Sequence, residues 1–326
     1  MTRPRVIVTR RLPAAVEAAV GEQFDAELST DDRPPTAEQL QWMLGQCDGL
    51  LATVTDRLTA DVLAAYPMRT RIIANFGVGT DHIDLAAASA HDIVVTNTPD
   101  VLTECTADLA MLLILMTMRR AGEGERLVRA GEWTGWRPND LVGRRVSGKT
   151  LGIVGMGRIG RAVAGRAHHG FGMRILCFNP SPVAAGDLAA VGAESRATLE
   201  GLLADADVVS LHTKLTPATR HMINSGNIGL LRKGTVIVNC ARGELVELGA
   251  LVASLKSGHI LAYAADVLDQ EPPPRDHPLL ALPNAIITPH IGSRTFESVQ
   301  RQATCAVENL TLFLSGKPPI AQANAV

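Results

Sequence analysis

Short apolar runs rich in β-branched residues recur along the whole chain, and helical patterns separate them. Most are apolar throughout, which is typical of strands in a parallel sheet that helices cover on both faces. Nine such runs occur: VIVT (6–9), GLLAT (49–53), IIANFG (72–77), IVVTNT (93–98), TLGIVG (150–155), ILCFN (175–179), DVVSLH (207–212), TVIVNC (235–240) and AIITPH (285–290). Because strands and helices alternate, we predict an α/β fold with parallel sheets.

Two long helical patterns lie on either side of the central strands. They are LTECTADLAMLLILMTMRRAGEGERLVRAG (102–131) and RTFESVQRQATCAVENLTLFLSG (294–316). A chain of 326 residues is long enough for two domains of ordinary size. We therefore predict a discontinuous outer domain, residues 1–100 plus 291–326, that encloses a central domain at residues 101–290. An active site is then expected in the cleft between them.

A glycine-rich turn follows one of the central strands. Residues 150–160 read TLGIVGMGRIG, in which Gly155, Gly157 and Gly160 open a helical stretch. In a dinucleotide-binding turn the first glycine permits the tight turn, the second lets the backbone approach a pyrophosphate, and the third allows helix and strand to pack closely. A turn without a ligand is the simpler alternative, but the flanking strand and helix favour a dinucleotide site. We therefore predict Rossmann-like domains with doubly wound sheets.

The next strand ends at Asn179, within ILCFNPSP (175–182). In the usual NAD arrangement, Asp or Glu at this position binds the ribose 2′-hydroxyl. Asn removes a charge that would repel a 2′-phosphate, an interaction of at most roughly 4 kcal/mol near a surface. It also weakens a charge-assisted hydrogen bond to the NAD ribose, worth about 1.5–3 kcal/mol. Both effects favour NADP.

Charge and cysteine usage exclude several classes of protein. With 31 basic and 33 acidic side chains, the formal net charge is −2, so no basic field indicates nucleic acid or an anionic membrane. The longest apolar run, LAMLLILMTM (109–118), is about half a membrane span and predicts a buried helix. No CxxC pair or metal-ligand pattern occurs among the cysteines, so we expect reduced thiols, no metal ion and a cytoplasmic protein. The five cysteines are Cys47, Cys105, Cys177, Cys240 and Cys305.

Seven motifs follow one another along nearly the whole chain: NFGVGTDHID (75–84), VTNTPDVLTECTADLA (95–110), GKTLGIVGMGRIG (148–160), LHTKLTPATRHMIN (211–224), VNCARGELVE (238–247), AADVLDQEP (264–272) and TPHIGS (288–293). In this order and spacing the chain resembles the D-isomer-specific 2-hydroxyacid dehydrogenases. The resemblance implies an outer domain that binds substrate and a central domain that binds the dinucleotide and carries a dimerisation arm. It also implies an NAD(P)H-dependent oxidoreductase that reduces small 2-oxo acids to D-2-hydroxy acids.

By motif, the family's catalytic residues fall on Arg242, Glu271 and His290. An arginine fork suits the carboxylate of a 2-oxo acid and polarises its carbonyl. An imidazole titrates near neutral pH, so His290 would serve as the general acid/base, with Glu271 orienting its ring. Without the family pattern, a surface arginine, a solvated loop acid and a core histidine would be the simpler interpretations.

The resemblance also implies binding residues. Backbone N–H groups at Val78 and Gly79 would hold the substrate carboxylate, and Asp266 would meet the nicotinamide carboxamide. The full set implied for the cofactor is Thr106, Gly155, Gly157, Arg158, Ile159, Gly160, Asn179, Ser181, His212, Lys214, Thr216, Cys240, Ala241, Asp266 and Gly292.

Two segments, GEWTGWRPNDLVG (131–143) and DHPLLALPN (276–284), are similar to the glyoxylate/hydroxypyruvate reductase branch. In that branch an aromatic residue from the dimer partner approaches the substrate pocket, and Trp136 matches it. Alternatively, Trp133 and Trp136 only pack the arm; a homodimer is implied in both cases. Phosphite dehydrogenases carry lysine where Val78 stands, and formate dehydrogenases replace the residue at Glu271, so glyoxylate or hydroxypyruvate is the expected substrate. A dehydrogenase of another 2-hydroxy acid and a dinucleotide-sensing, corepressor-like binding protein are the alternatives.

Cofactor choice depends on the residues that follow Asn179. NADP-using members of the family usually pair loss of the acid with a nearby arginine, but here Pro180, Ser181 and Pro182 follow. Ser181 can donate to a phosphate oxygen, and Lys214 is a candidate for approaching the same pocket. We therefore expect NADP(H), with NAD(H) weaker but not forbidden.

Overall fold

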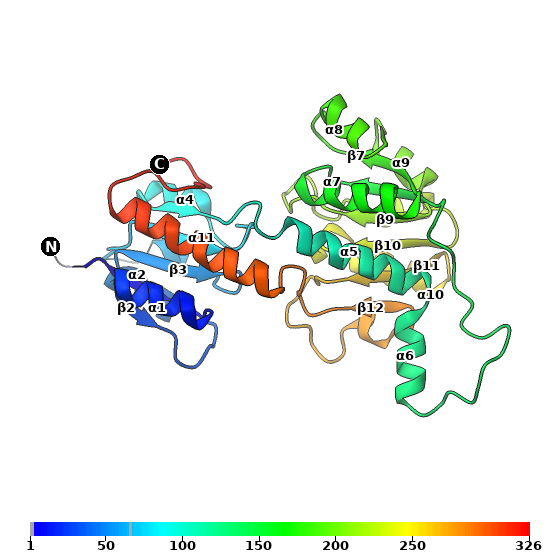
Figure 1. Cartoon of the computed structure of the whole chain (residues 1–326), viewed down its shortest axis with the longest axis horizontal. Helices are drawn as coiled ribbons and strands as arrows, with labels where there is room; N and C mark the ends of the chain where they lie inside the picture. Colours follow the sequence, from blue (N-terminus) through cyan, green and yellow to red (C-terminus); the bar gives the residue numbers. More distant parts are fainter. Residues whose placement is uncertain (1–2, 65–66) are drawn as a thin grey trace. The chain divides into compact units, whose positions relative to one another are not determined.

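The computed structural model describes residues 3–64 and 67–326. The chain divides into two compact units, residues 1–102 with 294–326 and residues 103–293. Each unit is built on one parallel sheet with helices on both faces, so the predicted fold class is confirmed (Figure 1).

The first unit contains a sheet with the strand order β2-β1-β3-β4-β5. Residues of α1 and α11 pack on one face, and residues of α2, α3 and α4 pack on the other. Its strands are β1 (Arg5–Val8), β2 (Asp25–Leu28), β3 (Gly49–Thr53), β4 (Ile72–Phe76) and β5 (Val94–Thr96). Its helices are α1 (Ala14–Gln23), α2 (Ala37–Gln46), α3 (Ala60–Leu63), α4 (Leu85–Ala90) and α11 (Phe296–Leu314).

The second unit contains a sheet with the order β12-β11-β10-β9-β6-β7-β8, so the strand order reverses beside β6. Helices α5 and α7 cover one face, and α9 and α10 cover the other (Figure 1). The strands are β6 (Thr150–Val154), β7 (Arg174–Phe178), β8 (Ala193–Ser195), β9 (Val208–Leu211), β10 (Thr235–Asn239), β11 (Ile260–Ala265) and β12 (Ala285–Ile287). The α-helices are α5 (Thr103–Met118), α6 (Ala121–Arg129), α7 (Arg158–Gly165), α8 (Ala185–Ala190), α9 (Leu199–Asp205) and α10 (Leu248–Lys256). The shorter helices are the π-helix η1 (Arg166–Gly170), which follows α7, and the 3₁₀ helices η2 (Ile228–Leu230), η3 (Gly243–Leu245) and η4 (Pro278–Ala281).

Each of the nine predicted runs contains a strand, but three strands escaped the sequence pattern. β2 (DAEL) and β8 (AES) are short, polar edge strands without the apolar run typical of a buried strand. β11 (ILAYAA) is almost wholly buried, but it is rich in alanine, which favours helices. Its place in the sheet is decided by its neighbours β10 and β12 rather than by its own propensity.

The segment 102–131, which carries one long helical pattern in the sequence, forms two helices, α5 and α6. Arg120 has φ +54°, in the left-handed region, and separates α5 from α6. The Met118 carbonyl, which a continuing helix would bond to a later residue of the same helix, instead accepts the Arg144 N–H at 2.7 Å. A contact distant in sequence therefore ends α5.

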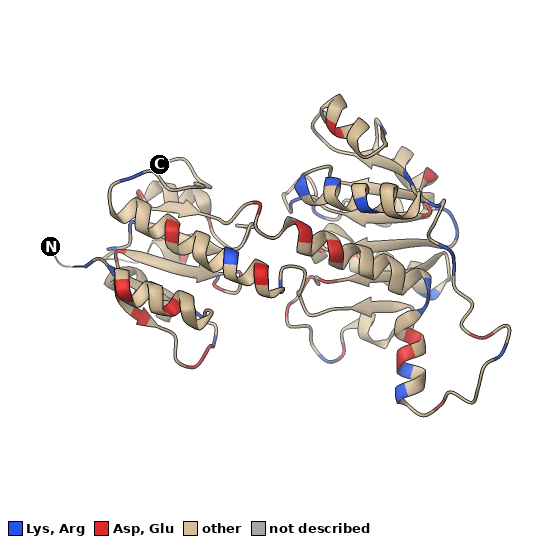
Figure 2. Ribbon diagram, viewed as in Figure 1, with Lys and Arg blue, Asp and Glu red and all other residues tan. Residues whose placement is uncertain are grey.

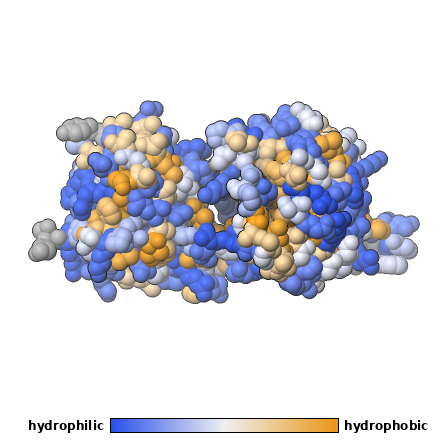
Figure 3. Space-filling model, turned by 90° about the horizontal axis from the view of Figure 1, so that it is seen from above, coloured by the Kyte–Doolittle hydropathy of each residue, from blue (hydrophilic) through white to orange (hydrophobic). Residues whose placement is uncertain are grey.

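Among the described helices, none combines the length and the apolar character needed to cross a bilayer. The described residues also contain no cluster of three or more His, Cys, Asp or Glu side chains suited to a metal ion. The surface in Figure 3 mixes hydrophilic and hydrophobic residues over both units.

Candidate active site and cofactor site

Most of the predicted site residues lie at one edge of the second unit's sheet. Because its strands are parallel, the residues that follow them are gathered at the carboxyl-terminal edge, where ligands bind in open α/β sheets. These residues are Gly155 after β6, Asn179 after β7, His212 after β9, Arg242 after β10, Asp266 after β11 and His290 after β12.

The glycines of the β6–α7 turn are required by close approaches. Gly155 has φ +98°, and a Cβ there would lie 2.6 Å from the backbone carbonyl atoms of His212. A Cβ on Gly160 would collide with the Gly155 carbonyl oxygen. A Cβ on Gly157, by contrast, would have no neighbour within 4 Å, so the backbone at the start of α7 faces open space. This turn fits a pyrophosphate, because the N–H groups and the dipole at the start of a helix favour an anion.

Basic residues lie along α7 (Figure 2), and they add positive charge near this turn. Arg158 is exposed at the first position of the helix. Arg161 pairs with Asp187, and Arg166 binds Glu104 and Asp108 at 2.6 and 2.7 Å. Of the three, Arg158 is the one at the start of α7, directly after the glycine turn.

The Asn179 side chain is bonded to the loops around it. Its Oδ1 accepts the Met156 N–H of the glycine turn at 3.0 Å. Its Nδ2 donates to the Ser181 carbonyl at 2.8 Å. The amide thus ties the end of β7 to the glycine turn, which the sequence alone did not predict.

The other predicted residues near this position differ in exposure. Ser181, Lys214 and Thr216 are exposed. Burial lowers the pKa of His212 to about 4, so this imidazole is neutral at pH 7; its Nε2 lies 2.8 Å from Ser210 Oγ. His212 therefore fills space next to Gly155 and adds no charge there.

His290 and Glu271 form the predicted pair. His290 Nδ1 lies 2.7 Å from Glu271 Oε2, and both side chains are about one-third exposed, at 37% and 36%. The Leu268 N–H donates to Glu271 Oε1 at 2.9 Å, so both carboxylate oxygens have a partner. Glu271 is thus able to fix the orientation of the imidazole ring.

The pKa of Glu271 reflects its neighbours. Burial would raise this pKa, but the hydrogen bond and charge of His290, the Leu268 N–H and the charge of Arg242 together lower it below the ordinary 4.5. Glu271 is therefore ionised at neutral pH. Both His290 and Arg242 therefore act electrostatically on Glu271.

The turn that carries His290 is held by Asp266. His290 has φ +54°, and its N–H donates to the Asp266 carbonyl at 3.0 Å. The buried Asp266 carboxylate accepts from Thr288 Oγ1 at 2.6 Å, from the Ile291 N–H at 2.8 Å and from the Gly292 N–H at 2.7 Å. These bonds stabilise a backbone conformation that residues other than glycine rarely adopt.

Other predicted residues lie around Asp266 and the His290 turn. Thr106 Oγ1 donates to the Gly292 carbonyl at 3.3 Å, which joins α5 to the His290 turn. Burial, and then the charge of Asp266, raise the pKa of the Cys240 thiol, so it stays protonated. Ala241 is half-buried next to it. The structure therefore brings together Thr106, Cys240, Asp266 and Gly292.

The predicted substrate-binding residues lie in other segments of the chain: Val78 and Gly79 in the loop after β4, and Trp136 in the segment after α6. In the first unit, the buried Asn75 amide donates to the carbonyls of Gly77 and Gly79 at 3.1 and 2.9 Å, and Asn97 donates to the Val78 carbonyl at 2.9 Å. These bonds fix the carbonyl groups of the loop. Trp136, in the segment after α6, is 81% exposed.

The sequence interpretation missed the residues that support Arg242. Asn239 ends β10, and its amide bonds the backbone of Ala241 and Arg242. A polar residue at the end of an otherwise apolar strand, three positions before the predicted arginine, was the only signal available for it.

Comparison with known proteins identifies the family. Residues 111–292 match the D-isomer specific 2-hydroxyacid dehydrogenase, NAD binding domain. The chain is 44% identical to a glyoxylate reductase of Aeropyrum pernix over 98% of this chain and 95% of that protein. It is 42% identical to one of Korarchaeum cryptofilum, over 97% and 95%. The crystal structure of the TT0316 protein from Thermus thermophilus superposes with a TM-score of 0.89 at 42% identity, covering 98% of this chain and 99% of that one. The chain therefore belongs to the D-isomer specific 2-hydroxyacid dehydrogenase family, is an oxidoreductase acting on CH–OH groups, and uses a nicotinamide dinucleotide.

Proposed function

We propose that this enzyme reduces small 2-oxo acids, glyoxylate and hydroxypyruvate first among them, to 2-hydroxy acids of the D series. The observation that carries the proposal is the His290–Glu271 pair, at 2.7 Å and within the electrostatic reach of Arg242, on the sheet edge that also carries the glycine turn. The relatives at 42–44% identity named as glyoxylate reductases support the choice of substrate.

The proposed role of each catalytic side chain follows from its functional group. Arg242 binds the carboxylate of the 2-oxo acid and polarises the neighbouring carbonyl through its planar fork. His290 Nδ1 lies against Glu271, which leaves Nε2 to give a proton to the carbonyl oxygen. The bound nicotinamide supplies the hydride. In the oxidative direction, the same Nε2 accepts the proton.

Backbone groups complete the proposed assignment. Val78 and Gly79 belong to the first unit, which we propose to be the substrate-binding domain, and the second unit would bind the dinucleotide. Because the carbonyls of this loop are tied to Asn75 and Asn97, its N–H groups are suited to a carboxylate. For the cofactor, the glycine turn would hold the pyrophosphate, and Asp266 with Thr106 the nicotinamide end.

We further propose that NADP(H) is preferred and that NAD(H) is weaker. Asn179 carries no charge to repel a 2′-phosphate, and its Oδ1 already accepts from Met156, which weakens it as an acceptor for the ribose 2′-hydroxyl of NAD. The exposed Ser181 and Lys214 are available as partners for a phosphate.

A homodimer formed through the segment after Arg120 is also proposed. Four large apolar side chains of this segment are exposed: Val128, Trp133, Trp136 and Val142. Such a concentration is typical of a surface that another chain covers. Cytoplasmic location likewise remains a prediction, drawn from the cysteine pattern.

A matrix of initial rates tests the proposed function. Purified protein is assayed with glyoxylate and hydroxypyruvate, each with NADPH and NADH. We expect turnover of both acids, with a larger kcat/KM for NADPH. Absence of turnover on any 2-oxo acid, together with tight dinucleotide binding, would favour the dinucleotide-sensing alternative. A higher kcat/KM with NADH than with NADPH would contradict only the proposed preference for NADP(H).

A further inference from the structure

A buried side-chain amide bonds the loop that carries Arg242. Asn239 is fully buried at the end of β10. Its Oδ1 accepts the Ala241 N–H at 3.0 Å, and its Nδ2 donates to the Arg242 carbonyl at 2.8 Å. The backbone of Arg242 is thus fixed by the side chain of a residue three positions earlier.

The Asn239 amide also reaches the neighbouring strand. Nδ2 lies 3.3 Å from the hydroxyl of Tyr263, which is 2% exposed in β11. Burial raises the pKa of this hydroxyl, and the charge of Asp269 acts in the same direction, against the hydrogen bond from Asn239. The hydroxyl therefore keeps its proton and is able to accept from Asn239 while donating to another group.

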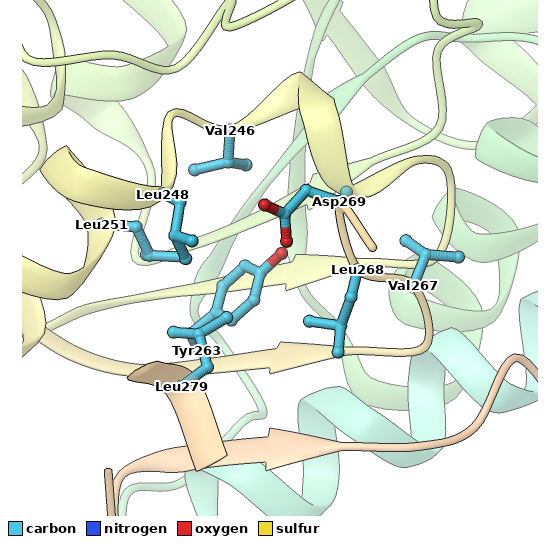
Figure 4. Close-up of a pocket in the computed structure, with 9 residues that line it drawn as sticks. Val246, Leu248, Leu251, Tyr263, Val267, Leu268, Asp269 and Leu279 are labelled. Atoms are coloured by element: carbon cyan, nitrogen blue, oxygen red, sulfur yellow. The ribbon is translucent and has the colours of Figure 1, made fainter. Parts of the chain in front are cut away.

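Figure 4 shows the Tyr263 hydroxyl pointing toward the Asp269 carboxylate, beside a small cavity lined mainly by apolar side chains. Asp269 Oδ1 lies 3.0 Å from Nε2 of the buried His277. The Leu279 N–H donates to His277 Nδ1 at 3.4 Å, so the ring proton is placed on Nε2, facing Asp269. The loop before Glu271 is therefore anchored on the side that faces Tyr263.

We propose that Asn239 and Tyr263 are a positioning pair, which holds Arg242 in the orientation that binds the carboxylate of the 2-oxo acid. The inference rests on the role of Arg242 in the proposed function. The simpler alternative is a buried polar pair that only stabilises the fold. The two differ in one respect: a positioning pair acts on the substrate only while Arg242 is present.

A double-mutant cycle separates these alternatives. The variants are Tyr263→Phe, which removes one hydroxyl, Arg242→Ala, and the combination of both. In the wild-type background, Tyr263→Phe is expected to lower kcat/KM for glyoxylate about 3- to 10-fold, the range of one neutral hydrogen bond, with KM for the dinucleotide unchanged. In the Arg242→Ala background it is expected to have no further effect.

Binding of oxamate in the presence of dinucleotide, measured by calorimetry, gives the same cycle without turnover. If Arg242→Ala leaves oxamate binding unchanged, the proposed role of Arg242 fails and the positioning pair with it. If Arg242→Ala weakens binding but Tyr263→Phe causes the same loss with and without Arg242, only the positioning pair is refuted.

A matched asparagine controls for general destabilisation. Asn227 also uses both ends of its amide on the backbone: Oδ1 accepts the Asn224 N–H at 2.9 Å, and Nδ2 donates to the Met222 carbonyl at 2.7 Å. Asn239→Ala is expected to raise KM for glyoxylate at least several-fold, and Asn227→Ala to leave it unchanged. An equal effect of the two variants on KM would overturn the proposal.

Discussion

His290 has Nδ1 2.7 Å from Glu271 Oε2, which leaves Nε2 as the nitrogen able to serve a substrate. His290→Ala is therefore expected to lower kcat about 10²- to 10⁴-fold, the usual contribution of a general acid or base. Dinucleotide binding, measured by fluorescence titration, should be nearly unchanged, because the glycine turn does not depend on the imidazole. An equal loss of turnover and dinucleotide binding would mean that His290 is structural.

Glu271 makes a pH-dependent contribution to stability. Its pKa in the folded protein is lowered from the ordinary 4.5, so this contribution is present above the unfolded-state value and is lost as pH falls through the folded-state value. Glu271→Gln should therefore destabilise the protein at neutral pH, and the difference from wild type should shrink below about pH 4.5. Urea unfolding of both proteins between about pH 3 and pH 7 measures this. A difference that grows on acidification would contradict the assignment.

At the scale of elements, the β6–α7 turn depends on glycine where the backbone has close neighbours. Gly160→Ala places a Cβ against the Gly155 carbonyl oxygen, so we expect a loss of stability of about 1–3 kcal/mol and weaker dinucleotide binding. Thermal unfolding and fluorescence titration measure the two effects.

Gly249→Ala is the matched control. Gly249 lies near the start of α10, where a Cβ meets nothing within 4 Å, so this change should stabilise the protein by about 0.4–1 kcal/mol. If Gly160→Ala behaved like Gly249→Ala, close packing of α7 on the turn would not be required.

The elements themselves were largely predictable, and their ends were not. Apolar runs located nine strands because buried strands of a parallel sheet leave a strong local pattern. The break between α5 and α6 escaped because the Met118 carbonyl is bonded by Arg144, a residue 26 positions later. Edge strands β2 and β8 escaped because a polar edge leaves no apolar run.

At the scale of the whole molecule, the proposed homodimer predicts a change in mass on mutation. Trp136 is 81% exposed, and Trp42, in α2 of the first unit, is 51% exposed. Trp136→Glu should convert a dimer to a monomer in sedimentation velocity, because a charge in an apolar contact is costly to desolvate. Trp42→Glu should leave the dimer intact. A monomeric wild-type protein, or dissociation by both variants, would contradict an interface through this segment.

The sequence by itself determined the fold class and the glycine turn, and it is the source of the proposal that Arg242, Glu271 and His290 are catalytic. These depend on local periodicity, on steric needs of single glycines and on motifs whose chemistry requires particular side chains. Only the tertiary structure decided which contacts form: that Asn179 bonds the glycine turn, that Asp266 fixes the left-handed turn of His290, and that Asn239 bonds both the Arg242 carbonyl and the Tyr263 hydroxyl. The reason is physical. Such contacts join strands far apart in the sequence, and a hydrogen bond between them depends on sheet order and register, which no single segment encodes.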